Sequence, residues 1–563
     1  MSFSPRSLTG NFSISPQLDA AEVSEAAARG FRSIICARPD DEQPGQPSAR
    51  DIEQAAIAAG LDFVSIPVVS GVIPDSISVA AMRKALDSLP GPVLGYCRSG
   101  TRAAWLWAMA EQGRQTASEI LSAGTAAGID LSPLKKALES SGQETKPADR
   151  SSATRKFDIV IAGGGAAGIS VAASILKRRS GVSIAIIEPS SEHYYQPGWT
   201  LVGGGVFRQE QTRRPEAPLI PKGVTWIRTA VTGFQPEAHE VGLGDGTTVA
   251  YRVLIVATGI ELNWGGISGL EETLGKNGVT SNYRYDLAPY TWKLVQELRK
   301  GNAVFTQPPM PIKCAGGPQK AVYLSCDHWL KEGVLRDINV SFDTATPALF
   351  GVADYVPALM NYIRRYNVDL KLKSKLVSVD GAKRIATFER VTDEGTVQVQ
   401  REFDMLHVVP PQVAPKVVRE SALAGADGFV AVDPATLRHV TWSDVFALGD
   451  VAGTSNAKTV AAVRKQVPVV AINVLEVLDG KGAIATYDGY GACPLTVERG
   501  KIVLAEFSYG GKLCPTLPVW LLNGTQPTSL AWFMKKEIMP RLYWDGMFKG
   551  HEILVAPKVT RKS

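Results

Sequence analysis

Three glycines form the clearest chemical pattern in the chain, because Gly163, Gly165 and Gly168 are spaced as G-x-G-x-x-G. They follow a run of β-branched residues, and such glycines let the backbone approach a pyrophosphate while the next helix directs its amides at the phosphates. A second expected strand, VSIAII, ends at Glu188, about twenty residues further on, where a carboxylate can bind ribose hydroxyls. The pattern predicts a dinucleotide site; the alternative is a structural glycine turn.

Two later stretches fit a flavin site. The expected strand VLIVATG ends at Thr258 and Gly259, where the chain would return beneath the first nucleotide site. The stretch VFALGD places Asp450 at a strand end, where its carboxylate can hold a ribityl hydroxyl. We expect the next helix to open near residues 455–458 and to direct its positive end and Lys458 at the flavin ring, which favours an anionic reduced flavin. The sequence therefore predicts FAD.

A second reactive pattern is Cys97-Arg98-Ser99-Gly100-Thr101-Arg102, between an expected strand and an expected helix. Successive loop amides and the helix dipole surround the sulfur of Cys97, and both favour the thiolate, so we expect its pKa to fall. Gly100 allows the loop to curl, and Arg102 is suited to hold an anion or the charged sulfur.

Alternating strands and helices must position these groups. Before residue 140 we expect strands near residues 31–39, 61–68 and 92–97 and helices near residues 51–60, 79–89 and 101–112. This alternation predicts an α/β fold with a parallel sheet. A chain of 563 residues is too long for one core. We expect a phosphatase-like or sulfurtransferase-like α/β domain at 1–140, a linker at 141–156, a flavoprotein body with two Rossmann-type dinucleotide-binding domains at 157–510 and a tail at 511–563.

The composition excludes several classes of protein. A net charge of +5 is too mild to indicate nucleic acid binding, and 45% apolar with 20% charged residues describes an ordinary globular protein. The six cysteines contain no C-x-x-C pair or disulfide framework, and the sequence shows no apolar signal segment and no run of eighteen apolar residues. We therefore expect a reducing, cytoplasmic setting, without a metal site.

The second nucleotide-binding unit departs from the usual pattern. After the expected strand NAVFTQP, the turn contains Cys314 and Pro318 instead of another G-x-G-x-x-G. Proline removes an amide, and the cysteine occupies the approach to the flavin, so we interpret this turn as a nicotinamide pocket given over to thiol chemistry. Asp343 follows the next expected strand, where a ribose-binding acid would sit, and this keeps a nicotinamide-dependent enzyme as the alternative.

The Cys97 loop resembles those of rhodanese-type sulfurtransferases and cysteine phosphatases. Tyr96 replaces the phosphatase histidine, and only four residues separate Cys97 from Arg102, a shorter cradle that suits a persulfide better than a phosphate. Residues 11–112 also look like a small phosphatase-like domain found fused to sulfur-oxidation enzymes. Asp40 in its ARPD stretch is either the general acid of a phosphatase or a residue that caps a turn.

Residues 157–551 resemble sulfide:quinone oxidoreductases of the mitochondrial type. The matching stretches are HYYQPGWTLVGGG, IKCAGGPQKAVYLS, ALGDVAGTSNAKT and YDGYGACPLTV. The resemblance implies that Cys314 is the flavin-side sulfur and Cys493 the carrier of the outgoing persulfide. It also implies sulfide and quinone as substrates, with a small thiol or sulfite as sulfur acceptor and Cys97 as the local candidate.

We expect FAD to be non-covalent, because no third cysteine is placed to tether it. Cys326 and Cys514 are interpreted as structural, and Cys36 as a buried small hydrophobe. We also expect a homo-oligomer.

The tail mixes bulky aromatic residues, among them Trp520, Trp544 and Phe548, with lysines and arginines. This composition suits amphipathic helices at a bilayer interface, here on the cytoplasmic side of the inner membrane. The alternative for the tail is a helix packed on the protein's own core. For the whole chain, the alternatives are an NAD(P)H-dependent persulfide or disulfide reductase, a phosphatase activity of the first domain, and a membrane-bound redox-sensing module.

Overall fold

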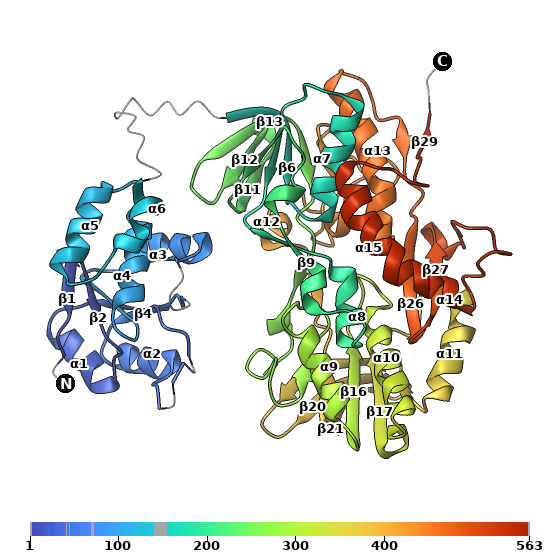
Figure 1. The fold of residues 1–563 in the computed structure, drawn as a ribbon, viewed down its shortest axis with the longest axis horizontal. Helices are drawn as coiled ribbons and strands as arrows, with labels where there is room; N and C mark the ends of the chain where they lie inside the picture. Colours follow the sequence, from blue (N-terminus) through green and yellow to red (C-terminus); the bar gives the residue numbers. More distant parts are fainter. Residues whose placement is uncertain (1–2, 41, 44, 69–72, 140–154, 561–563) are drawn as a thin grey trace. The chain divides into compact units, whose positions relative to one another are not determined.

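The computed structural model describes residues 3–560 except 41, 44, 69–72 and 140–154. The chain divides into two compact units, Met1–Ala153 and Thr154–Ser563 (Figure 1). The predicted linker falls almost wholly outside the described residues. Only Arg155 and Lys156 of it are described, and they already belong to the first strand of the second unit.

The first unit is a five-stranded sheet with helices. Its strand order is β1 (Arg6–Thr9), β2 (Phe12–Ser15), β5 (Val93–Tyr96), β3 (Ser33–Cys36) and β4 (Asp62–Ser65). Its helices are α1 (Ala20–Ala28), α2 (Ala49–Ala58), α3 (Ser76–Ser88), α4 (Thr101–Ala110), α5 (Ala117–Ala126) and α6 (Lys135–Glu139). β1 pairs antiparallel with β2, and the other neighbours are parallel. The parallel α/β prediction is confirmed, and Cys97 lies directly between β5 and α4.

The second unit contains two large sheets, of which the first is mixed and the second is parallel. The first sheet has the order β10 (Val224–Ile227), β7 (Ile184–Ile187), β6 (Arg155–Ala162), β13 (Thr248–Val256), β12 (Glu240–Leu243) and β11 (Val231–Gln235), with β24 (Val445–Ala447) also paired to β13. Strands β6, β13 and β24 are parallel neighbours. Their carboxyl ends therefore meet at one edge, the place where open α/β sheets bind ligands. The three sequence motifs for the flavin come directly after these three strands.

The second sheet carries the Cys314 turn. Its order is β15 (Val279–Thr280), β22 (Met405–His407), β16 (Gly301–Gln307), β17 (Ile338–Thr344) and β18 (Asp369–Lys371), all parallel. Beside it lies an antiparallel sheet of β19 (Ser374–Asp380), β20 (Ile385–Thr392) and β21 (Gly395–Glu402). The turn after β16 leads into α10 (Gly317–Lys331).

The other helices that frame the site are α7 (Ala166–Arg178), α8 (Trp199–Gly203), α9 (Ala288–Glu297), α11 (Val356–Arg365), α12 (Lys416–Arg419) and α13 (Val460–Leu478). Three short pairs complete the unit: β8 (Glu192–Tyr194) with β9 (Arg213–Pro215), β14 (Glu261–Leu262) with β23 (Gln412–Val413), and β25 (Ala485–Thr486) with β29 (Lys558–Val559). Helix α13 begins at Val460 with Thr459 as its N-cap, two residues after the predicted opening.

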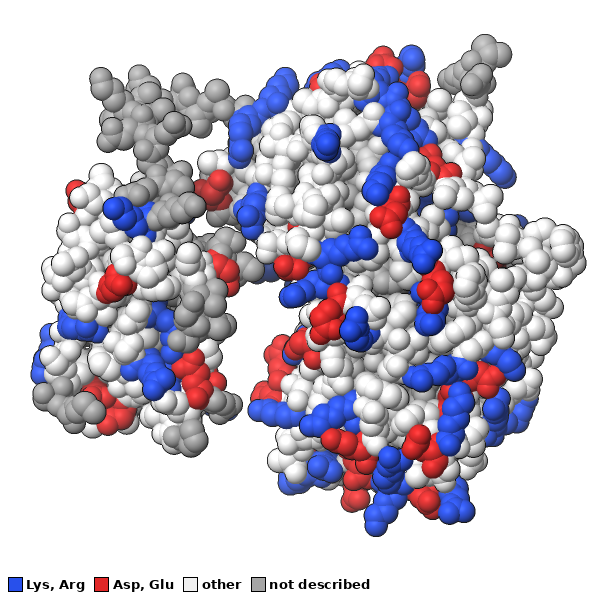
Figure 2. All heavy atoms as spheres, viewed as in Figure 1, with Lys and Arg blue, Asp and Glu red and all other residues white. Residues whose placement is uncertain are grey.

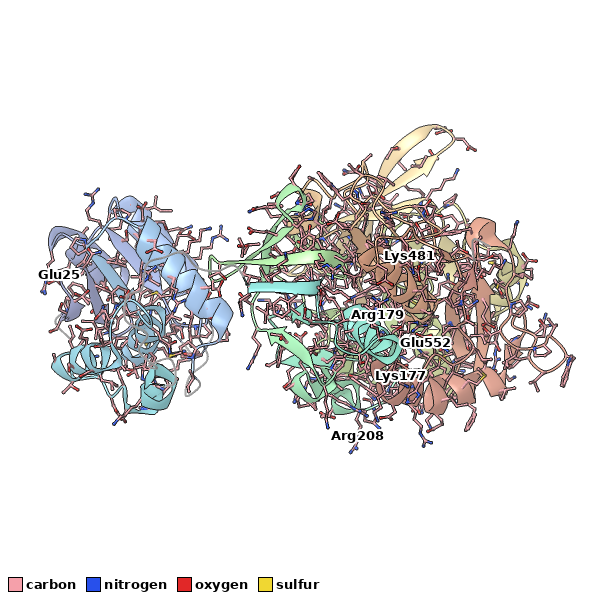
Figure 3. All side chains as sticks on the ribbon, turned by 90° about the horizontal axis from the view of Figure 1, so that it is seen from above. Glu25, Lys177, Arg179, Arg208, Lys481 and Glu552 are labelled. Carbon is pink, nitrogen blue, oxygen red and sulfur yellow. The ribbon has the colours of Figure 1, made fainter. Side chains whose placement is uncertain are left out.

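The end of the chain folds onto the second unit. β26 (Gly491–Glu498) carries Cys493 and pairs with β27 (Lys501–Phe507), which pairs with β28 (Pro527–Thr528). A continuous helical run, Ser529–Lys549, then includes α14 (Ser529–Phe533) and α15 (Met539–Arg541). We call this run the C-terminal helical segment. Beyond it, Glu552 lies against α7 (Figure 3). It accepts two hydrogen bonds from Arg178, at 2.6 and 2.7 Å.

The aromatic residues of the tail divide into two groups. Trp544 and Phe548 are 4% and 5% exposed and pack in the core of the first sheet, so their prediction as interfacial side chains is wrong. Trp520 is 85% exposed and Phe533 is 53% exposed. Trp520 lies in the loop before β28, whereas Phe533, Trp544 and Phe548 lie on the C-terminal helical segment, which presents one side to the protein and the other to solvent. None of the described helices is long and apolar enough to cross a bilayer.

Candidate active site

Two cysteines far apart in the sequence meet at the start of α10. The sulfur of Cys314, in the turn after β16, lies 3.4 Å from the sulfur of Cys493 on β26. Both are free thiols in this structure, and disulfide formation requires only a small approach of the two atoms. The turn is held from both sides: the Cys314 amide donates to the carbonyl of Lys458 at 2.8 Å, and the Tyr283 hydroxyl donates to the Cys314 carbonyl at 3.2 Å.

The two residues at the start of α10 must be glycines, because both lie against the groups that surround the cysteine pair. A methyl group on Gly316 would lie 2.5 Å from the sulfur of Cys493, and one on Gly317 would lie 2.3 Å from the hydroxyl of Tyr283. Cys314 itself has a φ of 54°, in the left-handed region that L-residues seldom adopt. The strained residue aims its side chain at the partner sulfur, and strain of this kind is found at functional sites.

A buried lysine gives the pair its charge pattern. The ammonium group of Lys320, one turn into α10 and 2% exposed, donates to the Cys314 sulfur at 2.9 Å. The hydrogen bond from Cys493 lowers the pKa of Cys314 well below its ordinary value, and Lys320 lowers it further against the effect of burial. The same hydrogen bond, together with burial, raises the pKa of Cys493. Cys314 is therefore the thiolate of the pair, and Cys493 holds the proton.

Two more lysines lie near Cys314, in the wall of one cavity. The amino group of Lys313 donates to Gln196 at 2.6 Å and lies over the Trp199 ring, and burial lowers its pKa to about 8. Lys535, from the C-terminal helical segment, is 3% exposed and donates to the carbonyl of Pro197 at 3.0 Å. Burial lowers the pKa of Lys535 to about 7, helped by the charge of Lys320. The cysteine pair thus lies in a positively charged environment that favours anions.

The dinucleotide loop has the shape that the glycine pattern predicts. Gly163 has a φ of 107°, and a methyl group there would lie 2.5 Å from the carbonyl oxygen of Ala257. A methyl group on Gly168 would collide with the carbonyl oxygen of Gly163, whereas Gly165 faces open space. Glu188 accepts a hydrogen bond from the Gly164 amide at 2.9 Å, and burial raises its pKa.

One cavity of about 460 Å³ runs from this loop to the cysteine pair. Its walls include these residues predicted for the flavin or for thiol chemistry: Gly163, Gly165, Glu188, Thr258, Gly259, Cys314, Asp450 and Lys458. Cys493 and Gly168 are adjacent in sequence to lining residues but do not line the cavity themselves. Thr258 Oγ1, Thr200 Oγ1 and Trp199 Nε1 line the same cavity, are buried, and have no hydrogen-bond partner among the described residues. Buried polar atoms normally have partners, so a cavity of this shape with open donors and acceptors fits a flavin dinucleotide.

Asp450 and Lys458 follow β24, at the same edge of the first sheet as the dinucleotide loop. Asp450 follows β24, and burial raises its pKa. The Lys458 ammonium donates to the carbonyl oxygens of Asp450 and Ala452, at 2.7 and 3.0 Å. Lys458 therefore holds the Asp450 turn in place in addition to lining the cavity.

Asp343 differs from the ribose-binding acid that the sequence left open. Its side chain is fully buried, accepts a hydrogen bond from Ser374 at 2.7 Å, and lies 3.2 Å from Arg401 and 3.7 Å from Arg390. A carboxylate enclosed by two arginines and a serine serves the packing of β17 against β19. This arrangement disfavours a nicotinamide ribose at Asp343.

In the first unit, Cys97 is 1% exposed and lies under the N-terminus of α4, where Gly100 is the N-cap with a φ of 89°. Arg102 donates to both carboxylate oxygens of Glu42, at 2.6 and 2.7 Å, and this contact lowers the pKa of Glu42 to about 2. Asp40 instead accepts a hydrogen bond from the Ala49 amide at the start of α2. The structure therefore supports the capping interpretation of Asp40, and the acid that reaches the Cys97 loop is Glu42.

Comparison with known proteins identifies the family. Residues 157–295 match the family model described as pyridine nucleotide-disulphide oxidoreductase. A mitochondrial sulfide:quinone oxidoreductase of Dictyostelium discoideum is 41% identical over 395 residues, which cover 70% of this chain and 86% of that protein. The mouse mitochondrial enzyme is 37% identical over 399 residues, 71% of this chain and 88% of that protein. The chain belongs to the sulfide:quinone oxidoreductase family. The predicted resemblance is thereby confirmed.

The fold agrees with this family assignment. The crystal structure of the sulfide:quinone oxidoreductase of Aquifex aeolicus matches with a TM-score of 0.60 at 19% identity, over 73% of this chain and 98% of that chain. The first unit has relatives of its own: residues 4–114 match the phosphatase-like domain of the beta-lactamase hydrolase-like protein family. One such protein of Agrobacterium fabrum is 40% identical over 121 residues, 21% of this chain and 28% of that protein. The chain is thus a flavin-dependent oxidoreductase of this family preceded by a phosphatase-like domain.

Sequence reasoning missed three charged residues of the sites. Lys320 stands six residues after Cys314, and its place on the same face as the turn was available from helix geometry. Lys535 and Glu42 had no local signal. Lys535 lies more than 200 positions from Cys314, and Glu42 lies two residues beyond the ARPD stretch.

Proposed function

We propose that this protein oxidises sulfide at the Cys314–Cys493 pair, with FAD as its cofactor and a quinone as the electron acceptor. The observation that carries the proposal is the pair itself: two sulfurs 3.4 Å apart, one contacted by a buried ammonium group, at the end of a cavity that starts at a dinucleotide loop. The family's named substrates, sulfide and quinone, agree with this chemistry.

The reaction starts from the disulfide form of the pair. Hydrosulfide attacks the sulfur of Cys493, a sulfur–sulfur bond forms there, and the bridge to Cys314 breaks. Cys314 leaves as the thiolate that Lys320 stabilises, and Cys493 carries the persulfide. A thiolate acceptor then takes the outer sulfur and leaves Cys493 as a thiolate. When the two thiolates close the disulfide again they release two electrons, and bound FAD supplies the acceptor for these electrons and their route to the quinone.

The buried lysines decide which sulfur carries the negative charge when the disulfide opens. Because Lys320 donates to the Cys314 sulfur at 2.9 Å, the negative charge of the opened bridge is stabilised on the Cys314 side. Burial opposes the charge of Lys320, but the two sulfurs of the reduced pair raise its pKa, so Lys320 is protonated while the pair is reduced. Lys535 has a pKa of about 7, which suits a group that exchanges a proton with the site at neutral pH.

The first unit supplies a second thiol for the outgoing sulfur. Cys97 lies under the N-terminus of α4, and a persulfide needs only the donors of the loop and this helix. Glu42 already binds the two terminal nitrogens of Arg102, which leaves less positive charge for a phosphate dianion. We therefore propose a sulfane-sulfur acceptor in preference to a phosphatase; sulfite or a small thiol is the final acceptor.

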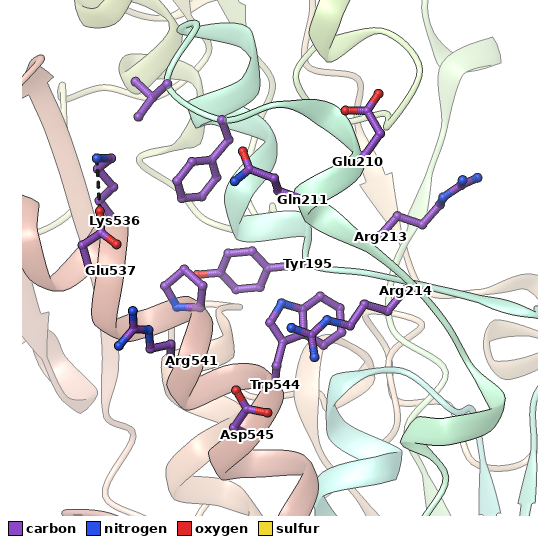
Figure 4. Close-up of a pocket in the computed structure, with 13 residues that line it drawn as sticks. Tyr195, Glu210, Gln211, Arg213, Arg214, Lys536, Glu537, Arg541, Trp544 and Asp545 are labelled. Atoms are coloured by element: carbon purple, nitrogen blue, oxygen red, sulfur yellow. Dashed lines mark ion pairs between the residues drawn. The ribbon is translucent and has the colours of Figure 1, made fainter.

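An exposed apolar surface suits peripheral contact with the membrane that holds the quinone. Val519, Trp520, Leu521, Leu530, Phe533 and Ile538 are all exposed. The surface over α14 and the preceding loop shows few charged side chains at the right-hand edge of Figure 2. Beside it opens a cleft of about 630 Å³ with basic residues on its walls, where Arg214 lies over the Trp544 ring at 4.4 Å (Figure 4). Apolar side chains beside basic ones are the pattern of interfacial binding.

The deciding experiment adds sulfide or NADH to the oxidised protein without oxygen and follows the flavin absorbance. Sulfide should bleach the flavin, and Cys314→Ser should keep its FAD yet slow bleaching by orders of magnitude. Rapid bleaching by NADH, with none by sulfide, would establish the nicotinamide-dependent alternative. Near-normal sulfide turnover in Cys314→Ser would refute the assignment of Cys314.

A further inference from the structure

A second carboxylate lies beside Glu188 at the nucleotide end of the flavin cavity. Glu216 follows β9, lines this cavity and is 1% exposed. Its Oε1 approaches the dinucleotide loop so closely that a methyl group on Gly164 would lie 2.9 Å from it. This oxygen is buried and has no hydrogen-bond partner among the described residues. A buried carboxylate oxygen without a donor is costly, so this atom indicates a missing ligand group.

The other oxygen of Glu216 is fixed by a chain of buried side chains. Oε2 lies 2.9 Å from Nδ1 of His193, and Nε2 of His193 lies 2.7 Å from the hydroxyl of Tyr543. His193 is 5% exposed and packs against Tyr543, Trp544 and Phe548 of the C-terminal helical segment. Because one oxygen is held in this way, the carboxylate cannot rotate freely, and Oε1 stays directed at the cavity.

The oxygens of Glu188 are already engaged by the backbone. One accepts from the Gly164 amide at 2.9 Å and the other from the Ser190 amide at 2.8 Å. Each has capacity for one more donor, but neither is as open as Oε1 of Glu216. The nearby glycine loop is built for phosphates, whereas a carboxylate repels them and accepts from neutral hydroxyl groups.

We propose that Glu216 is a second ribose-binding carboxylate, which accepts a hydrogen bond from a hydroxyl of the adenosine ribose of FAD and is held in position by His193 and Tyr543. The proposal rests on the proposed FAD cofactor and extends it to a residue outside the glycine pattern. The carboxylate also excludes a phosphorylated ribose, because two negative charges would meet in a buried site. Through Tyr543, the C-terminal helical segment takes part in holding the nucleotide.

The test measures binding, not turnover. Flavin-free protein is titrated with FAD and with FMN by fluorescence quenching, and with ADP by competition against FAD. Glu216→Ala should weaken FAD and ADP about 10- to 100-fold, the effect of losing a hydrogen bond to a charged group, and leave FMN unchanged because FMN lacks the adenosine. Glu216→Gln should weaken FAD less, and Tyr543→Phe should weaken it by a smaller factor still. Glu210→Gln is the matched control on the neighbouring segment.

The outcomes separate the two proposals. Wild-type protein that binds FMN as tightly as FAD would overturn the FAD assignment itself. Wild-type protein that prefers FAD, together with a Glu216→Ala variant that keeps the full preference, would overturn the role of Glu216 alone. An equal loss of FAD and FMN would mean general damage to the cavity and would also overturn it. If Glu216→Ala does not fold, Glu216→Gln decides: an unchanged FAD affinity refutes the proposal.

Discussion

Replacing Lys320 by methionine removes the ammonium group that contacts the Cys314 sulfur while it keeps most of the buried volume. The contact is 2.9 Å long, and a hydrogen bond to a charged group contributes about 1.5–3 kcal/mol. One pKa unit corresponds to about 1.36 kcal/mol, so the pKa of Cys314 should rise by about one to two units. The native pKa is depressed, and loss of the cation must move it upward toward the ordinary value.

The assay is alkylation of the reduced protein by iodoacetamide between pH 5 and pH 10, with modified Cys314 followed by peptide mass spectrometry. The midpoint of the rate against pH should shift upward by about one to two units in Lys320→Met. Sulfide-driven flavin reduction at pH 7 should slow about 10-fold and recover in part at higher pH. Lys293→Met, an exposed lysine on α9, is the matched control and should behave as wild type.

The flavin content of each variant is measured first, so that a loss of cofactor is not mistaken for a loss of thiolate. An alkylation midpoint in Lys320→Met equal to that of wild type would refute the electrostatic role of Lys320. In that case the low pKa of Cys314 would have to come mainly from Cys493, with a smaller contribution from Lys535, and Cys493→Ser would then produce most of the shift.

Three further predictions test other parts of the molecule. The pKa of Lys535 falls from 10.5 to about 7 on folding, so the folded state loses stability relative to the unfolded state as the pH falls through this window. The Tm of Lys535→Met should therefore exceed that of wild type by more at pH 6.5 than at pH 9. A difference in Tm that does not depend on pH would contradict this. The double variant Trp520→Glu with Phe533→Glu should bind phospholipid vesicles more than 10-fold more weakly, because each side chain contributes about 1.5–3 kcal/mol when buried. The control is Ile57→Glu, at another exposed apolar residue. Unchanged vesicle binding by the double variant would exclude this surface. After sulfide treatment, mass spectrometry should find a persulfide on Cys97, whereas an unmodified Cys97 with brisk phosphate-ester hydrolysis would restore the phosphatase.

The sequence predicted what is local. Gly163 and Gly168 lie so close to backbone oxygens that no larger residue fits at either position, and the parallel strand order brings Thr258 and Asp450 to the same edge. The pairing of Cys314 with Cys493 came from the family resemblance, because 179 residues separate them and no periodic pattern relates the turn after β16 to β26.

The sequence could not show which side of the tail is buried. Trp544 and Phe548 belong to the same aromatic-rich tail as Trp520, yet they pack against His193 and the first sheet of the second unit. Irregular, widened turns in the C-terminal helical segment shift its faces, so a regular helical period misplaces the aromatic residues. Deletion of the whole tail would be a poor test of membrane binding, because it would also remove Lys535 and Tyr543 from the cavity wall.

The C-terminal helical segment forms part of the cavity wall, and this affects when a flavin can enter during synthesis. Its lining residues are Lys535, Met539, Tyr543 and Met547. The glycine loop leaves the ribosome early, but the wall that covers it is among the last parts of the chain to be synthesised. Through most of synthesis the nucleotide groove is therefore open along one side, and a flavin can enter sideways instead of threading into a closed cavity. Nonsense mutations that remove only the last few dozen codons should yield chains that still form the first sheet but lose their flavin, a defect visible as colourless protein.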